Sequence, residues 1–156
     1  MILHFAYGSN MSPAVMRRHA PLAVPVGVAK LAGHRFVITA DGYASVARAR
    51  NAAVYGVLWR ITPRDRVTLD AWENVSAGLY RAAVLPVLQS GRRRAALVYI
   101  ARARPAGQAK ANYMELVIAA ALEWRLPAVY ISSLRRWLPR QPAGAGPGKL
   151  EEFRWT

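Results

Sequence analysis

Apolar residues recur along the chain with two periods, and the change between them separates predicted strands from predicted helices. Residues 1–7 form an apolar run of strand-forming residues without a breaker, and residues 53–61 give the strongest strand pattern in the chain. Gly56 within the second run predicts a bulge or a close approach of another backbone. Pro86 predicts that a strand over residues 80–88 ends at a sheet edge. Weaker strand patterns cover residues 24–32, 33–40, 43–48, 80–88 and 94–103.

Helix-start signals and three-to-four spacing predict four helices between and after these strands. Ser12 is followed by proline and predicts a cap with a helix ending near residue 19, and Thr62 predicts a second capped helix to about residue 72 or 73. Apolar residues at three-to-four spacing predict helices over residues 108–124 and 128–138. The order of these elements predicts an α+β fold with a mixed, barrel-like sheet.

The length of 156 residues predicts a single domain over residues 1–156, with a core of useful size. No apolar run approaches the roughly 18 residues that span a bilayer, so no membrane partner is expected. The absence of cysteine excludes disulfides and thiol nucleophiles, and together with the lack of a leader pattern it favours a cytoplasmic location. Residues 139–156 are rich in proline, glycine and alanine and predict a mobile tail.

The net charge of +14 comes from 22 Lys and Arg against 8 Asp and Glu. Such a balance is typical of proteins that bind nucleic acids or anionic surfaces. The positive residues are spread along the whole chain, and neither an RNA-binding aromatic motif nor helix-turn-helix spacing accompanies them. The charge therefore predicts non-specific binding at most, and no specific nucleic-acid partner.

A polar turn stands between the first predicted strand and the first predicted helix. Gly8, Ser9 and Asn10 form it, and Ser12 caps the helix that follows. A strand-to-helix turn presents unpaired backbone N–H groups and the positive end of the helix dipole. This arrangement predicts a place for an anion such as a carboxylate. Ser9 has no base near it in sequence, so we expect it to bind backbone or ligand rather than to act as a nucleophile.

Among the few acidic residues, Glu73 is the strongest candidate for proton transfer. It lies with Asp70 at i and i+3 near the end of a predicted helix, beside Trp72. A carboxyl held against apolar surface has a raised pKa, which suits general acid–base work. The alternative is a surface glutamate, although a helix C-terminus disfavours negative charge. The three histidines have no metal-binding spacing, so no metal and no cofactor are predicted.

Two segments together resemble signature motifs of the gamma-glutamylcyclotransferase family, also called the AIG2-like superfamily. Phe5–Met11 resembles its Tyr-Gly-Ser-Asn signature. Leu69–Glu73 resembles its Leu-Asp-x-x-Glu-Gly segment, and Tyr80 resembles the tyrosine that follows it. Tyr113 falls where several members have a pocket tyrosine. The similarity runs from residue 2 to about residue 138.

The resemblance implies a small mixed β-barrel with flanking helices and an intramolecular reaction. The α-amine of a γ-glutamyl amine or γ-glutamyl amino acid attacks its own γ-amide carbonyl and releases 5-oxoproline and a free amine, without metal, cofactor or covalent enzyme intermediate. Glu73 is implied as general acid and base. The residues implied to bind this small-molecule substrate are Tyr7, Gly8, Ser9, Asn10, Tyr80 and Tyr113.

One position departs from the family pattern, because the glycine after the glutamate is Asn74 here. Asparagine tolerates left-handed backbone better than other non-glycine residues, so we expect the turn to form with an added side chain at the pocket rim. A non-catalytic small-molecule binding module on the same fold remains the alternative function. The leaving amine and the oligomeric state stay open at this stage.

Overall fold

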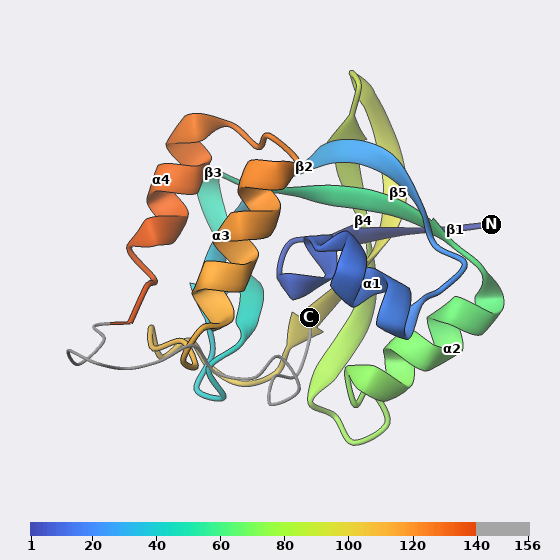
Figure 1. Ribbon diagram of the computed structural model, residues 1–156, viewed down its shortest axis with the longest axis horizontal. Coiled ribbons are helices and arrows are strands. Elements are labelled where there is room, and N and C mark those ends of the chain that lie inside the picture. The colour runs from blue at the N-terminus through green and yellow to red at the C-terminus, as the bar shows by residue number, and fades with distance from the viewer. Residues whose placement is uncertain (140–156) are drawn as a thin grey trace.

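Five strands close into a barrel, and helices pack around it in the computed structural model, which describes residues 1–139 (Figure 1). The predicted tail over residues 139–156 lies outside the described residues except for Pro139. The elements are β1 (Ile2–Ala6), the 3-10 helix η1 (Ser9–Met11), α1 (Pro13–His19), β2 (Val24–Ile38), β3 (Ala44–Ile61), α2 (Pro63–Trp72), β4 (Tyr80–Gln89), β5 (Arg92–Ala101), α3 (Tyr113–Glu123) and α4 (Ala128–Arg135).

The strands follow the order β1-β3-β2-β4-β5 around the barrel. All neighbours are antiparallel except β1 and β5, which run parallel and pair at His4 and Leu97. The expected α+β fold with a small mixed barrel is therefore confirmed. The sheet is closed, and Pro86 pairs with Ala95 of β5. On its other side β4 pairs with β2 only at Leu88, so Pro86 has no partner there and occupies a local edge, as its sequence position predicted.

The four predicted strand segments between residues 24 and 61 merge into one long hairpin of β2 and β3. Its register shifts between Ala32 and His34, so the weak alternation before Gly33 and the stronger run after it belong to one strand. Of the bulge or close approach predicted at Gly56, the structure shows the close approach. A Cβ built on Gly56 would lie 2.2 Å from the Ala6 carbonyl oxygen and 2.9 Å from the Phe5 ring.

The first two helices begin where their capping residues predicted, whereas α3 starts five residues later than expected. The segment before Tyr113 is bonded to the hairpin of β2 and β3: Ala106 N–H donates to the Ile38 carbonyl at 2.8 Å, and Lys110 N–H donates to Gly42 at 3.1 Å. These bonds hold residues 106–110 along the hairpin, and the helix begins only after them. Helix α4 ends at Arg135 rather than at residue 138.

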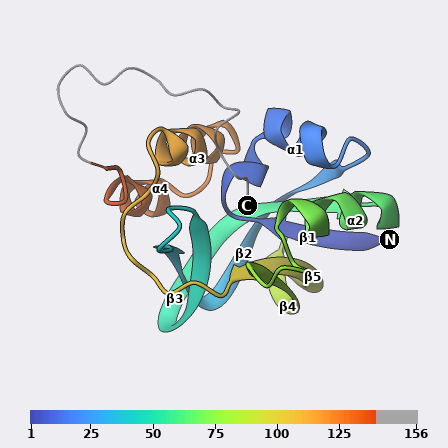
Figure 2. The same ribbon diagram turned by 90° about the horizontal axis from the view of Figure 1, so that it is seen from below.

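The helices form two pairs on either side of the turn that follows β1. Helix α3 packs against α4 and against η1, while α1 packs against α2. Both views show the chain between β1 and α1 lying between these pairs (Figures 1 and 2). None of the helices within residues 1–139 is long and apolar enough to cross a membrane. The arrangement brings the end of β1, the end of α2 and the start of α3 toward one region.

Candidate functional site

Glu73 is held at the end of a helix whose start is fixed by a capping box. Thr62 Oγ1 accepts a hydrogen bond from Asp65 N–H at 3.1 Å, and Asp65 Oδ2 accepts one from Thr62 N–H at 3.2 Å. Ten residues of α2 follow, and Glu73 is the residue that caps its C-terminus. The Glu73 side chain is 0% exposed, which is unusual for a carboxylate. The surface interpretation of Glu73 is therefore excluded.

The turn after Glu73 is a Schellman motif, a common way to end a helix. Asn74 N–H donates to the Ala71 carbonyl and Val75 N–H donates to the Asp70 carbonyl, both at 3.1 Å. Asn74 takes the left-handed backbone of this motif, with φ of 51°. The turn that we expected to form with Asn74 in place of glycine is confirmed. Glu73 is the C-cap residue of α2, directly before this turn.

The polar turn after β1 differs from the expected strand-to-helix junction. A 3-10 turn lies between β1 and α1, closed by Met11 N–H donating to the Gly8 carbonyl at 3.1 Å and Ser12 N–H donating to the Ser9 carbonyl at 3.0 Å. Helix α1 begins at Pro13 with Ser12 as its cap, as the sequence predicted. The difference is the added 3-10 turn, which the polar segment forms before the helix.

Asn10 supplies the clearest sign of a ligand at this turn. Its side chain is 0% exposed, and neither Oδ1 nor Nδ2 has a hydrogen-bond partner among the described residues. A buried amide without partners costs free energy that a bound polar ligand would recover. Gly8 and Ser9 are also buried, so the whole turn faces the interior rather than solvent.

Tyr7 lies close enough to Glu73 and Tyr113 to respond to their charges. Its hydroxyl donates to the Tyr99 carbonyl at 2.5 Å. Burial raises the pKa of Tyr7 well above its usual value, and the charges of Glu73 and Tyr113 raise it further. Tyr7 therefore stays neutral, and the structure brings Tyr7, Glu73 and Tyr113 together.

Tyr80 and Tyr113 meet at one residue, Ala44, at the start of β3. Tyr80 Oη donates to the Ala44 carbonyl at 2.9 Å, and Ala44 N–H donates to Tyr113 Oη at 3.2 Å. Both tyrosines are buried, and the Tyr43 ring packs edge-on against Tyr113 at 5.4 Å between centroids. The two hydroxyls thus fix β3 to the elements that carry the tyrosines.

Two further residues adjoin this region that the sequence motifs did not indicate. Ser45 Oγ accepts a hydrogen bond from Ala101 N–H at 3.0 Å. A side-chain hydrogen bond between Ser45 and Tyr7 lowers the pKa of Tyr7, but burial raises it by more. Tyr99 Oη donates to Asp70 Oδ1 at 2.6 Å. Both partners lie far away in sequence, so only the closed barrel shows the contacts.

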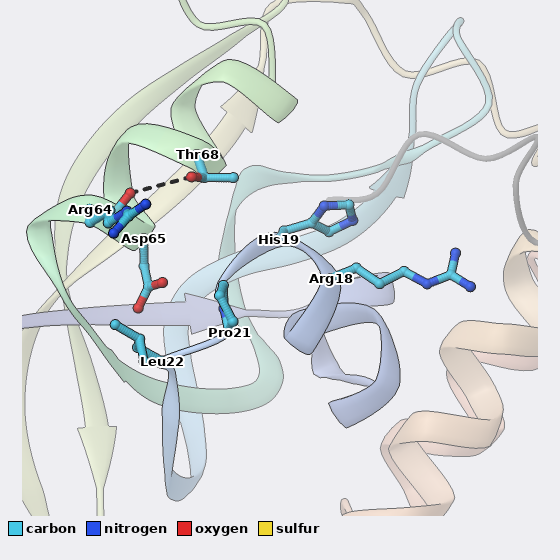
Figure 3. A pocket seen from close by; sticks show the side chains of 7 residues that line it. All are labelled: Arg18, His19, Pro21, Leu22, Arg64, Asp65 and Thr68. Carbon is cyan, nitrogen blue, oxygen red and sulfur yellow. Dashed lines mark hydrogen bonds between the residues drawn. The ribbon is translucent and has the colours of Figure 1, made fainter.

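The pocket between the end of α1 and the start of α2 lies outside this site (Figure 3). It encloses about 450 Å³, and its Asp65 side chain is already engaged in the capping box. Arg18 points away from Asp65 in this view. His19 stacks on Trp72 with 4.1 Å between ring centroids, and burial lowers the pKa of His19 to about 4. The stacking fixes α1 against the end of α2.

No group of three or more His, Cys, Asp or Glu side chains within residues 1–139 is arranged to hold a metal ion.

Comparison with known proteins identifies the family. The AIG2-like family pattern matches residues 53–134, which is 82 of the 156 residues. The chain belongs to the AIG2-like family. It is 24% identical to the gamma-glutamylcyclotransferases of Mus musculus and Homo sapiens, over 97% of this chain and 86% of each relative.

Solved structures show that this AIG2-like chain shares its fold with several known proteins. A structure described as gamma-glutamyl cyclotransferase superposes with a TM-score of 0.81 at 24% identity and covers 92% of both chains. YkqA from Bacillus subtilis superposes with a TM-score of 0.75 at 28% identity, over 90% of this chain and 56% of that protein. The resemblance inferred from the two motifs and the barrel fold implied by it are both confirmed.

Proposed function

We propose that this AIG2-like protein is a gamma-glutamylcyclotransferase-type enzyme with Glu73 as its general acid and base. Its substrate is a small γ-glutamyl amine or γ-glutamyl amino acid, and its products are 5-oxoproline and the free amine. The proposal is supported by the named relatives, which are gamma-glutamylcyclotransferases. The relatives support the reaction class, and the residue roles rest on the geometry described above.

The observation that carries the proposal is the complete burial of Glu73 beside the Tyr7 turn. A carboxyl at a helix C-terminus meets the negative end of the dipole, and burial removes its hydration. Burying a carboxyl at this position lowers stability, and costs of this kind are typical of functional sites. Burial raises the pKa of Tyr7 and the charge of Glu73 raises it further, which supports a position of Glu73 near the turn.

The turn after β1 is suited to hold the glutamyl part of the substrate. The Asn10 amide offers one donor group and one acceptor that the described residues leave without partners. Those groups match the α-carboxylate and α-amine of a glutamyl moiety. In this proposal the buried Tyr80 and Tyr113, both bonded to Ala44, bound the substrate site, which favours a folded substrate in which amine and carbonyl are already close.

The proton balance needs only one carboxyl. Glu73 takes a proton from the substrate ammonium, and the free amine then attacks the γ-carbonyl carbon. The C–N bond to the leaving amine breaks as the tetrahedral intermediate collapses, and Glu73 delivers its proton to the departing nitrogen. The ring nitrogen keeps one hydrogen in 5-oxoproline, so it loses a second proton, which the freed amine takes up to leave as an ammonium. Glu73 therefore ends each turnover in its starting state.

The test is 5-oxoproline release from a panel of γ-glutamyl dipeptides and γ-glutamylamines by wild type and Glu73→Gln. We expect Glu73→Gln to keep the fold and to lose at least about 100-fold in kcat, the scale of general acid–base catalysis. Glu123→Gln is the matched control, because Glu123 is exposed at the end of α3. It should retain wild-type turnover.

The outcomes separate the enzyme from a binding module on the same fold. Near wild-type turnover by Glu73→Gln would exclude Glu73 as the acid and base. Thermal stabilisation of wild type by a panel compound without any product would favour the binding module instead.

A further inference from the structure

The Asp70 side chain connects the helix that carries Glu73 to a strand of the barrel. Its Oδ1 accepts a hydrogen bond from Tyr99 Oη at 2.6 Å, which joins α2 to β5. Arg66 Nε, one turn earlier in α2, donates to both oxygens of the same carboxylate at 3.2 Å. The Asp70 carbonyl accepts from Val75 N–H at 3.1 Å. Asp70 is thus bonded through its side chain to the barrel and through its backbone to the turn after Glu73.

Tyr99 extends this connection to the turn that follows β1. Its carbonyl oxygen accepts from Tyr7 Oη at 2.5 Å, while its own hydroxyl reaches Asp70. The two hydrogen bonds at opposite ends of one buried residue form a continuous path from α2 through β5 to Tyr7. This path joins the segment that holds Glu73 to the segment proposed to hold the substrate.

The hydroxyl of Tyr99 keeps its donor role over the whole pH range in which enzymes are assayed. Burial raises the pKa of Tyr99 far above its usual value, and the hydrogen bond to Asp70 raises it further. The ring is also fixed, because His4 packs edge-on against it with 5.4 Å between centroids. The donor hydroxyl of Tyr99 is therefore neutral and its ring is held in place.

We infer that Asp70 and Tyr99 are positioning residues that hold the Glu73 carboxyl in register with the Tyr7 turn, an inference that rests on the proposed role of Glu73. Helix ends fray, and Glu73 is the C-cap that follows the last residue of α2. Asp70 lies three residues before it, so the Tyr99 hydrogen bond restrains the last helical turn against the barrel. Misplacement of a catalytic group by about 1 Å can cost about 100-fold in rate.

An ordinary exposed ion pair does not account for the arrangement. The Arg66–Asp70 pair lies four residues apart on one helix and is about one third exposed on each side chain, so alone it would stabilise only α2. The hydrogen bond from Tyr99 comes from a different element and is short and charge-assisted. It fixes the position of α2, which the helical pair cannot do.

The first arm of the test compares Tyr99→Phe and Asp70→Leu with wild type in 5-oxoproline release. Tyr99→Phe removes only the hydroxyl and keeps the ring against His4. We expect kcat to fall about 10- to 100-fold while KM changes less than about threefold, because the substrate-binding turn is intact. The double variant should be no slower than the slower single variant, since both remove one hydrogen bond. Tyr55→Phe on β3 is the matched control and should keep wild-type kcat.

The second arm asks whether the effect passes through Glu73. In a Glu73→Gln background, Tyr99→Phe should cause no further loss of kcat. The carboxyl ¹³C resonance of Glu73, assigned by its absence in Glu73→Gln, should move in Tyr99→Phe and Asp70→Leu but not in Tyr55→Phe. This resonance does not depend on activity.

The outcomes keep the positioning role separate from the proposed function. A wild-type protein that forms no 5-oxoproline would end the proposed function, and the Glu73 resonance would then decide the positioning role. Wild-type kcat in Tyr99→Phe, an unmoved resonance, or an equal loss in the Glu73→Gln background would each overturn the inference.

Discussion

Asn74 adopts the left-handed backbone conformation that glycine usually takes at this position of a helix end. Its φ of 51° places it in the left-handed region, and the two hydrogen bonds of the Schellman turn depend on that conformation. Left-handed backbone strains most L-residues but not glycine. The side chain of Asn74 therefore has a small conformational cost and adds atoms beside Glu73.

Asn74→Gly should raise the free energy of unfolding by less than about 1 kcal/mol, because relief of the left-handed strain exceeds the added freedom of the unfolded chain. Asn74→Ala should lower it by roughly 1 kcal/mol, because alanine lacks the tolerance of asparagine for this conformation. Urea unfolding of both variants measures the difference. Equal stabilities for glycine and alanine would show that the backbone conformation at residue 74 carries no strain.

His4 is a buried histidine next to the network of Tyr99. Its Nδ1 lies 3.2 Å from the Leu97 carbonyl oxygen, and its Nε2 has no hydrogen-bond partner within the described part of the chain. Burial lowers the pKa of His4 to about 4, with a smaller lowering from Arg66. The ring is therefore neutral in the folded protein at neutral pH.

The lowered pKa makes folding pH-dependent. Between pH 6.5 and about 4 the unfolded chain binds a proton at His4 that the folded chain does not, so stability falls as pH falls through this range. His4 should contribute a loss of about 2 kcal/mol between pH 7 and pH 5. Urea unfolding at both values should show a smaller loss for His4→Phe than for wild type, with His34→Phe as the control. A His4→Phe variant with the full wild-type pH dependence would contradict the assignment.

At the scale of elements, helix boundaries that depend on neighbouring residues were predictable, and helix boundaries that depend on distant partners were not. Thr62 caps α2 through residues three positions away, so the sequence alone indicated it. The late start of α3 follows from hydrogen bonds between residues 106–110 and the hairpin at Ile38 and Gly42. Apolar spacing contains no information about such partners.

Strand continuity shows the same division. The apolar pattern predicted two strands, over residues 24–32 and 33–40, but pairing with β3 continues on both sides of the register shift between Ala32 and His34. A bulge absorbs the irregularity without ending the strand. The glycine at residue 56 was the clearer signal, because a glycine within a strong strand indicates either a bulge or a close approach, and the structure shows the close approach.

Gly56→Ala tests that explanation directly. A Cβ at this position would overlap the Ala6 carbonyl oxygen, at 2.2 Å, and that oxygen belongs to backbone that cannot move without disturbing the β1–β3 ladder. We expect a loss of at least about 3 kcal/mol in the free energy of unfolding. Gly91→Ala is the control, because a Cβ on Gly91 would meet no atom and would strain only the backbone, whose φ is 75°. It should cost about 1 kcal/mol, and an equal loss for both would exclude the close approach.

At the scale of the whole molecule, the candidate site depends on contacts that join distant parts of the chain. The Tyr7–Tyr99 hydrogen bond spans 92 residues and the Tyr80–Ala44 bond spans 36. Motif resemblance supplied the candidate residues, and closure of the barrel supplies their proximity. The burial of Glu73 and the unpartnered amide of Asn10 are likewise properties of the folded molecule.

The surface charge also belongs to the whole molecule. The sequence contains 22 basic and 8 acidic residues, and β4 and β5 contain no acidic residue at all. The β4–β5 hairpin carries the densest basic run, Arg92–Arg94, of which two are exposed. Other exposed arginines lie elsewhere on the barrel, at Arg48, Arg50 and Arg60. A surface of this kind attracts polyanions without selecting among them.

Replacing Arg92–Arg94 jointly with glutamine should therefore weaken binding to a random-sequence DNA duplex without abolishing it. The slope of log K against log salt should become shallower by at most about 3, as expected for three lost phosphate contacts. A control triple replacement at Arg48, Arg50 and Arg60 should have a comparable effect, because the charge is distributed. Fluorescence anisotropy over a salt series measures both slopes, and 5-oxoproline release should stay at the wild-type rate in both variants. Loss of binding only in the Arg92–Arg94 variant would instead identify the β4–β5 hairpin as a localised nucleic-acid surface.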